Sequence, residues 1–300
     1  MFPSTEALEA AKVMVAGDAP WQRELRLRQA RWRQHLDVPP GTVNGRPLGS
    51  RLPSGDETSN FLTPAAADAV RRAMRQLGAL VSAPRIFDNM LSSQPLAFNL
   101  FAELGEDLRA ATSVCRGLWP DLIHKVDEIR FEWSPGRGDA RYLANRSAFD
   151  VAVMGRDATG VPTCVGIEVK YHEDMTQDPG SPRNPRYDEV AVASGVFRDP
   201  HASGLRELPL RQIWFDQLLA LSMLGDGDAQ VGRVRFVLLA PAVNVRAVEV
   251  DASYRDHLCN ALTYERRTLE EVVAVIGATT GASWVEDFEQ RYLRPTSAMA

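Results

Sequence analysis

The chain has 300 residues, of which 45% are hydrophobic and 24% charged, and its formal net charge is −5. These values are typical of a soluble globular protein, and they exclude a disordered or fibrous chain and a globally basic nucleic-acid binder. The longest apolar run, 236–243, is too short to span a membrane, and the first residues show no signal-peptide pattern. Three widely spaced cysteines form no disulfide or zinc pattern, so we expect a cytoplasmic protein.

The first 120 residues are predicted to be mainly helical. Three helices are expected from apolar residues at helical spacing and from helix-start signals, over 5–36, 64–80 and 95–117. The segment 37–60 is rich in Pro, Gly and Ser and predicts a linker. We therefore divide the chain into a helical N-terminal extension, 1–84, and a second domain, 85–300.

The centre of the chain changes to an α/β pattern. Alternating or continuous apolar runs predict four strands, over 125–133, 147–155, 163–171 and 234–240. Helices are predicted over 186–197, 208–224, 253–262, 269–276 and 282–293. This order predicts an α/β core of a three-strand antiparallel meander and a further strand, flanked by helices.

Two of these strands bring acidic residues together. If 157–161 forms the loop of a hairpin, its arms have equal length and Asp150 lies opposite Glu168, with side-chain bases ~5 Å apart. Two opposed carboxylates in an apolar sheet repel one another and are poorly solvated, so they need a cation. The neighbouring positions that would leave room for it carry small residues, namely Ala148, Ala152 and Gly166.

A lysine lies beside this acidic pair. Lys170 follows Glu168 by two residues, on the same face of the strand. It is one of three lysines among 34 basic residues, the others being Lys12 and Lys125. Converging carboxylates suit Mg²⁺ or Mn²⁺, and a nearby lysine can position a water molecule and offset phosphate charge. This chemistry indicates metal-assisted hydrolysis of phosphodiester bonds, and the alternative is a surface ion pair on an edge strand.

The spacing of Asp150, Glu168 and Lys170 resembles the motif of the PD-(D/E)XK nuclease superfamily, which has a restriction-endonuclease-like fold. Segments 93–101, 146–150 and 166–171 also resemble a bacterial group described as restriction endonucleases, with similarity over about residues 85 to 275. Phe149 stands where the superfamily name has proline, a substitution that many members share. The core of that fold has the order of elements expected above.

The resemblance implies a role for each residue of the motif. Asp150 and Glu168, with the backbone carbonyl of Val169, would bind Mg²⁺ or Mn²⁺, and Lys170 would serve the attacking water. Glu103, on the helix before the meander, and Gln212, at the start of the helix after it, are further candidate catalytic residues. A solvated flank and an exposed glutamine are the alternatives for these two.

Four other polar residues lie near the motif in sequence. Glu132 either faces the site from the first strand or is exposed on the surface. Gln94 is expected to be a cap or turn residue. His172 and Glu173 follow Lys170 where the strand ends, and a lone histidine there is expected to be structural rather than a ligand.

Basic residues indicate where DNA would be bound. The loop before Asp150 carries three arginines that we expect to contact phosphate, Arg137, Arg141 and Arg146. A second group, the five arginines from Arg23 to Arg33, interleaves with Trp21 and Trp32. It either follows phosphates or forms a solvated helix face that packs its tryptophans inward.

These observations predict a Mg²⁺-dependent DNA nuclease, an endonuclease of restriction or defence that does not bind membranes and could form a homodimer. The alternatives are a repair or recombination nuclease of the same superfamily, and a catalytically silent copy that binds nucleic acid.

Overall fold

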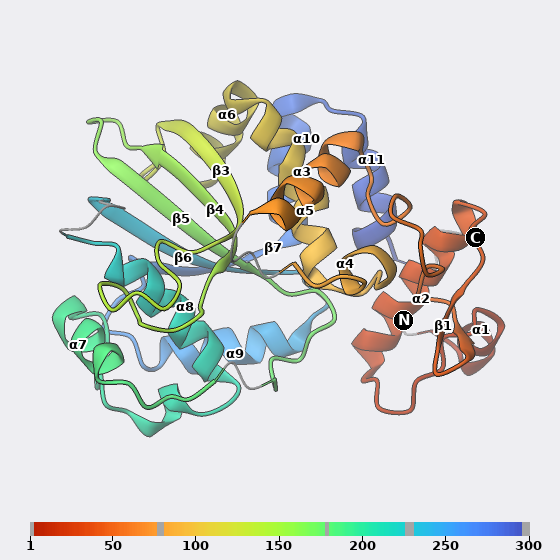
Figure 1. Ribbon diagram of the computed structural model, residues 1–300, viewed down its shortest axis with the longest axis horizontal. Helices are drawn as coiled ribbons and strands as arrows, with labels where there is room; N and C mark the ends of the chain where they lie inside the picture. Colours follow the sequence, from red (N-terminus) through yellow and green to blue (C-terminus); the bar gives the residue numbers. More distant parts are fainter. Residues whose placement is uncertain (1–2, 77–80, 178–179, 226–230, 296–300) are drawn as a thin grey trace.

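A five-stranded sheet with the strand order β3-β4-β5-β6-β7 forms the centre of the protein (Figure 1). The computed structural model describes residues 3–76, 81–177, 180–225 and 231–295. The strands are β3 (Lys125–Trp133), β4 (Phe149–Arg156), β5 (Pro162–Val169), β6 (Arg233–Ala240) and β7 (Tyr264–Thr268). The first three form an antiparallel meander, and β6 and β7 continue the sheet in parallel with β5. The predicted α/β fold, with its meander and further strand, is confirmed.

The β4–β5 hairpin has the predicted register. Its paired residues run from Arg156 opposite Pro162 to Val151 opposite Ile167. Asp157 closes the loop, because its Oδ1 accepts the backbone N–H groups of Thr159 (2.9 Å) and Val161 (3.0 Å). A tight, hydrogen-bonded loop fixes the register of the strands that it joins.

Helices cover both faces of the sheet and bury its apolar side chains (Figure 1). One face is covered by α5 (Ser93–Glu106), α6 (Leu108–Leu118) and α10 (Leu269–Thr280). The other is covered by α7 (Pro185–Ser194), α8 (Leu210–Ser222) and α9 (Val245–Arg255), with the short 3-10 helix η1 (Ser203–Arg206) before α8. Strands that are buried on both faces explain the almost continuous apolar sequence of β6.

Two predicted helices are each divided in the structure. The expected helix over 5–36 is α1 (Thr5–Ala10) and α2 (Pro20–His35), because Lys12 turns the chain with a φ of +58° and Pro20 starts a new helix. The expected helix over 95–117 is interrupted at Asp107, whose carboxylate accepts the N–H groups that begin α6.

Other boundaries also differ from the prediction. The helix expected over 253–262 lies earlier, as α9, and the one over 282–293 is α11 (Trp284–Phe288) followed by a π-helical turn, η2 (Glu289–Leu293). The helix expected over 64–80 is α3 (Pro64–Arg75), and residues 77–80 lie outside the described part. Among the residues that the structure describes, none of the helices is long and apolar enough to cross a membrane.

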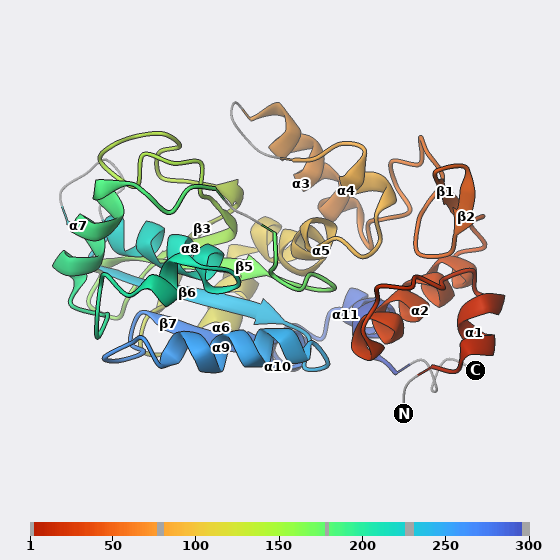
Figure 2. The same ribbon diagram turned by 90° about the horizontal axis from the view of Figure 1, so that it is seen from below.

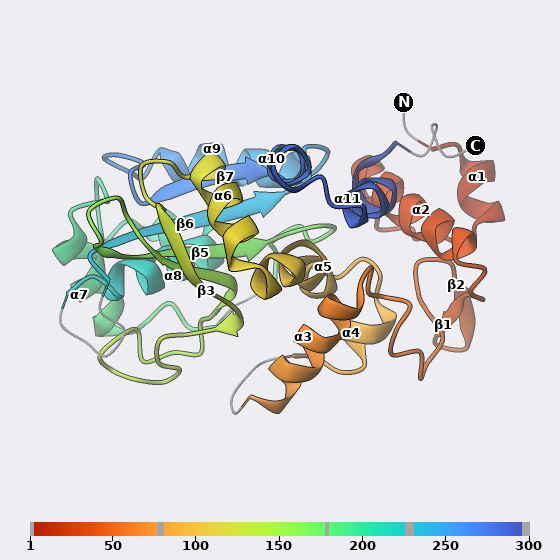
Figure 3. The same ribbon diagram turned by 90° about the horizontal axis from the view of Figure 1, so that it is seen from above.

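The N-terminal elements lie at one end of the molecule, next to α11 (Figures 2 and 3). The expected linker contains a small hairpin, β1 (Gly41–Val43) and β2 (Arg46–Leu48), and α4 (Arg85–Asp88) follows α3. Three arginines of α2 are buried rather than available to DNA: Arg26 pairs with Asp18, and Arg28 and Arg33 donate to the carbonyls of Tyr292 and Gly49. Trp21 and Trp32 are buried, as the second alternative expected, but these three arginines form neither a phosphate-binding nor a solvated face.

A fully buried arginine joins the N-terminal elements to the C-terminal segment. Arg291 donates from Nε to Gln29 Oε1 (3.0 Å) and from Nη1 to the Asn60 carbonyl (2.8 Å). Gln29 also donates from Nε2 to the hydroxyl of Tyr171 (2.9 Å), the residue after Lys170. Buried polar groups need such partners, so this network fixes α2 against the chain that leaves β5.

Candidate active site

Asp150 and Glu168 lie at the same end of the β4–β5 hairpin. They come one step beyond the last paired residues, Val151 and Ile167. Asp150 Oδ2 accepts the backbone N–H of Val169 at 2.8 Å, which holds the carboxylate against the end of β5. Asp150 is therefore fixed beside the backbone of Val169, whose carbonyl is the expected third oxygen donor.

Glu168, Lys170 and Gln212 form a closed group of hydrogen bonds. Lys170 Nζ lies 2.6 Å from Glu168 Oε1 and 3.0 Å from Gln212 Oε1. Gln212 Nε2 also donates to Glu168 Oε1 at 2.5 Å. Glu168 is 5% exposed and Lys170 6%, so a surface pair on an edge strand is excluded by burial and by the central position of β5.

A cavity of about 570 Å³ opens above these residues. Asp150, Glu168 and Gln212 line it, together with two further acidic residues, Glu132 and Asp216. Exposed arginines stand at its wall in two loops, Arg146 before β4 and Arg183 before α7. The arrangement places carboxylates inside the cavity and positive charge at its margin.

Glu132 faces the cavity rather than the surface. It lies near the end of β3 with a φ of +48°, a conformation that non-glycine residues rarely adopt, and its Oε1 accepts Gln94 Nε2 at 2.6 Å. Burial, together with the negative charge of Glu168, raises the pKa of Glu132 to about 7 against the opposing effect of Gln94. Strain of this kind accumulates at functional sites.

Asp216 is a cavity residue that sequence reasoning missed. It is 4% exposed, and its Oδ2 has no hydrogen-bond partner among the residues that the structure describes. Burial, with the charge of Glu168, raises the pKa of this carboxyl well above its usual value. The sequence does contain one signal for it: Gln212 lies four residues earlier on α8, and residues four apart on a helix share a face.

The electrostatics of the cavity favour a cation. Burial and the charges of Glu168 and Glu132 raise the pKa of Asp150 well above its usual value. Burial lowers the pKa of Lys170, but the charges of Glu168, Glu173 and Asp150 raise it further than that. Among the described residues, no three His, Cys, Asp or Glu side chains form a metal-binding group. Two carboxylates with one carbonyl, and a buried oxygen without a partner, nevertheless fit a hard divalent ion.

The space that Gly166 leaves is filled by an aromatic ring. A Cβ on Gly166 would lie 2.5 Å from a ring carbon of Phe149, which is completely buried. We expected Gly166 to leave room for a cation, but instead it leaves room for this ring. Phe149 thus packs against β5 directly before Asp150 and supports the position of that carboxylate.

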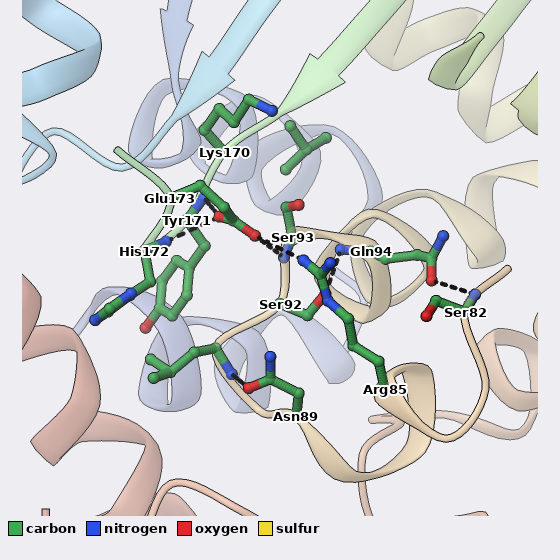
Figure 4. Close-up of polar contacts among 12 residues, drawn as sticks. Ser82, Arg85, Asn89, Ser92, Ser93, Gln94, Lys170, Tyr171, His172 and Glu173 are labelled. Carbon is green, nitrogen blue, oxygen red and sulfur yellow. Dashed lines mark hydrogen bonds and ion pairs between the residues drawn. The ribbon is translucent and has the colours of Figure 1, made fainter. Parts of the chain in front are cut away.

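Glu173 connects the chain after Lys170 to helix α5 (Figure 4). Its Oε2 accepts the N–H groups of Tyr171 (2.9 Å) and His172 (3.1 Å), and its Oε1 accepts the N–H of Ser93 (2.9 Å). Arg85 lies 3.5 Å from the same carboxylate. A carboxylate at a helix N-terminus is favourably placed, so Glu173 holds the turn that follows Lys170 against α5.

A family model of the PD-(D/E)XK nuclease superfamily matches residues 16–294. The chain belongs to this superfamily. No curated protein and no solved structure matches it. Superfamily members are generally metal-dependent nucleases, so a nucleic acid is the substrate class that membership implies.

Glu103 does not join the acidic residues of the cavity. It lies near the C-terminal end of α5, whereas the N-terminal end of that helix contacts Glu173. Glu103 lines a separate hollow with Asp107 and Trp284. The separation follows from helix geometry, because ten residues of helix span ~15 Å. We therefore no longer include Glu103 among the candidate catalytic residues.

The three arginines of the loop before Asp150 have different surroundings. Arg137 donates from Nη2 to the carbonyl of Glu132 (2.7 Å), and burial lowers its pKa. Arg141 is exposed and pairs with Asp139 at 2.7 Å. Arg146 alone of the three lines the cavity, as does Arg183, which we did not predict.

Proposed function

We propose that this chain is a Mg²⁺- or Mn²⁺-dependent nuclease that hydrolyses phosphodiester bonds of DNA. The observation that carries the proposal is the convergence of Asp150 and Glu168 in one cavity, with Lys170 bonded to Glu168, at the end of a hairpin with the register that the motif requires. A chance match to the motif would not bring these side chains together at a buried position.

Each residue has a specific role in this proposal. Asp150, Glu168 and the Val169 carbonyl would hold the metal ion, which when bound lowers the pKa of a water molecule and stabilises negative charge on the phosphate. Lys170 is a charged hydrogen-bond donor in this proposal, and it donates to the attacking water and to a phosphate oxygen.

The margin of the cavity supports a nucleic-acid substrate. Arg146 and Arg183 are exposed there and can contact phosphates on either side of the cleaved bond. We further propose an endonuclease of restriction or defence, which the resemblance to restriction endonucleases supports.

Plasmid cleavage tests the proposal. Supercoiled DNA incubated with the protein and millimolar Mg²⁺ or Mn²⁺ should become nicked or linear, and EDTA should prevent this. The variant Lys170→Ala should lose cleavage and still retard DNA in a gel, because lysine acts on the transition state rather than on binding. Lys125→Ala, which removes a lysine that is 66% exposed, is the matched control and should cut normally.

The same assay separates the other functions. Degradation of linear or branched DNA with intact supercoiled plasmid would indicate a repair or recombination nuclease. Binding without cleavage under every metal condition would indicate a catalytically silent copy and refute the proposed activity.

A further inference from the structure

The ammonium of Lys170 contacts Glu168, the carboxylate that the proposed function assigns to the metal ion. Lys170 Nζ lies 2.6 Å from Glu168 Oε1, at a buried position. A divalent cation on Glu168 would repel this ammonium, and at low dielectric such repulsion is strong. If Glu168 binds a metal ion, as the proposed function requires, Lys170 needs another partner.

Helix α8 carries two side chains that can bind the ammonium of Lys170 when it leaves Glu168. Lys170 Nζ already donates to Gln212 Oε1 at 3.0 Å. One turn further along the same face of α8 is Asp216, which lines the same cavity. Its buried Oδ2 has no hydrogen-bond partner in the described part of the chain.

The other carboxylates near Lys170 are already engaged. Glu173 accepts the N–H groups of Ser93, Tyr171 and His172 and lies beside Arg85. Asp150 accepts the N–H of Val169 and is itself an expected metal ligand. A buried carboxylate oxygen without a hydrogen-bond partner is costly, so Asp216 gains from receiving the ammonium.

We propose that Asp216 accepts the ammonium of Lys170 when a divalent cation binds Glu168. Asp216 is then a positioning residue that acts through Lys170: it keeps the lysine buried and charged in the metal-loaded protein. Gln212 contacts Lys170 in the metal-free structure and lies one helical turn from Asp216, so it can keep its bond to the lysine in both states.

The small number of lysines makes this exchange of partners measurable. Lys12, Lys125 and Lys170 are the only lysines of the chain, so lysine labelled with ¹⁵N gives three ammonium signals. An ammonium group is visible when an ion pair protects its protons from exchange with water. Assignment follows from Lys170→Arg, and Mg²⁺ alone is the probe, without DNA.

We expect the Lys170 signal of the unaltered chain to move on addition of Mg²⁺ and to remain visible. In Asp216→Asn it should be visible without Mg²⁺, because Glu168 still holds the lysine. With Mg²⁺ its protons should exchange faster by on the order of tenfold, as expected when a charge-assisted hydrogen bond is lost. Asp216→Glu should restore part of the protection, and exposed Asp287→Asn should change nothing.

Two results would overturn the role of Asp216 and leave the proposed nuclease function standing. One is an Asp216→Asn signal that matches the unaltered chain in Mg²⁺. The other is the loss of one bound Mn²⁺ in this variant by calorimetry, which would make Asp216 a direct ligand. If Mg²⁺ leaves Lys170 unmoved in the unaltered chain, the metal role of Glu168 fails as well. In DNA cleavage, Asp216→Asn should lower kcat and leave KM nearly unchanged, because the lysine acts on the transition state.

Discussion

Glu173 Oε1 accepts the backbone N–H of Ser93, 80 residues earlier in the chain, at 2.9 Å. Through this bond the first turn of α5 and the turn after Lys170 share one carboxylate. Glu173→Gln keeps the shape but removes the charge and one of the two acceptor oxygens. We expect a loss of about 1–3 kcal/mol in the free energy of unfolding and a lower rate of DNA cleavage.

Urea unfolding and plasmid cleavage measure these effects. The matched control is Glu270→Gln, because Glu270 also accepts one backbone N–H, from Ala242 at 2.9 Å, at an exposed position away from the cavity. Equal stability losses in both variants would argue against a particular contribution of Glu173.

Asp150→Asn should remove a repelled charge without removing a hydrogen bond. The raised pKa of Asp150 shows that its ionised form is disfavoured beside Glu168 and Glu132, and an amide oxygen can still accept the N–H of Val169. The metal-free variant should therefore melt no lower than the unaltered chain. It should lose most of the increase in melting temperature that Mg²⁺ or Mn²⁺ gives, and it should not cut DNA.

Thermal melts with EDTA and with millimolar metal check this expectation. Asp157→Asn is the control in the same hairpin, because Asp157 closes the loop and the hydrogen bonds from Thr159 lower its pKa. It should destabilise the chain and leave the metal response intact. An Asp150→Asn protein that is destabilised, indifferent to metal and still active would end the metal-ligand assignment.

Glu132 should make the stability of the metal-free chain fall with rising pH. Its pKa is raised from 4.5 to about 7, so the folded chain binds more protons than the unfolded chain between these values. The contribution is complete below pH 4.5 and is lost as the pH rises through 7. Glu132→Gln should flatten this part of the curve of unfolding free energy against pH, and an unchanged curve would contradict the assignment.

Gly166→Ala should destabilise the hairpin by overpacking. The added Cβ would meet the buried ring of Phe149 at 2.5 Å, and such overpacking costs about 1–3 kcal/mol. Gly105→Ala is the opposite case, because its Cβ would lie 3.9 Å from Ile129 within helix α5. There the change should be neutral or stabilising. Urea unfolding of the two variants measures the change in free energy of unfolding. Equal changes would show that the ring of Phe149 moves aside at little cost.

The hairpin and its motif could be predicted because short-range chemistry determines them. Equal arms around Asp157 fixed the register, and the register alone brought Asp150 toward Glu168. Strands β4, β5 and β6 have strong apolar patterns because both faces of the sheet are covered there.

The remaining features depend on contacts between distant segments. Strand β7 reads Tyr-Glu-Arg-Arg-Thr from residue 264, a polar edge sequence that pairs only because β6 lies beside it. The arginines of α2 suggested phosphate contacts. In the structure, however, Arg26 binds Asp18 and Arg28 binds the carbonyl of Tyr292. Spacing puts Asp216 on the same face of α8 as Gln212, but only the packing of α8 against the sheet turns that face toward Glu168.

The buried network of Arg291 has a consequence for synthesis on the ribosome. All residues of the cavity are made before Arg291, and Gln29 and Asn60, which Arg291 joins, are made much earlier still. A nascent chain therefore holds Gln29 and Asn60 without their partner, and Tyr171 contacts a glutamine that is not yet fixed. Since domains generally fold as units during translation, the chain after Lys170 becomes fully fixed only after η2, which carries Arg291, has left the ribosome.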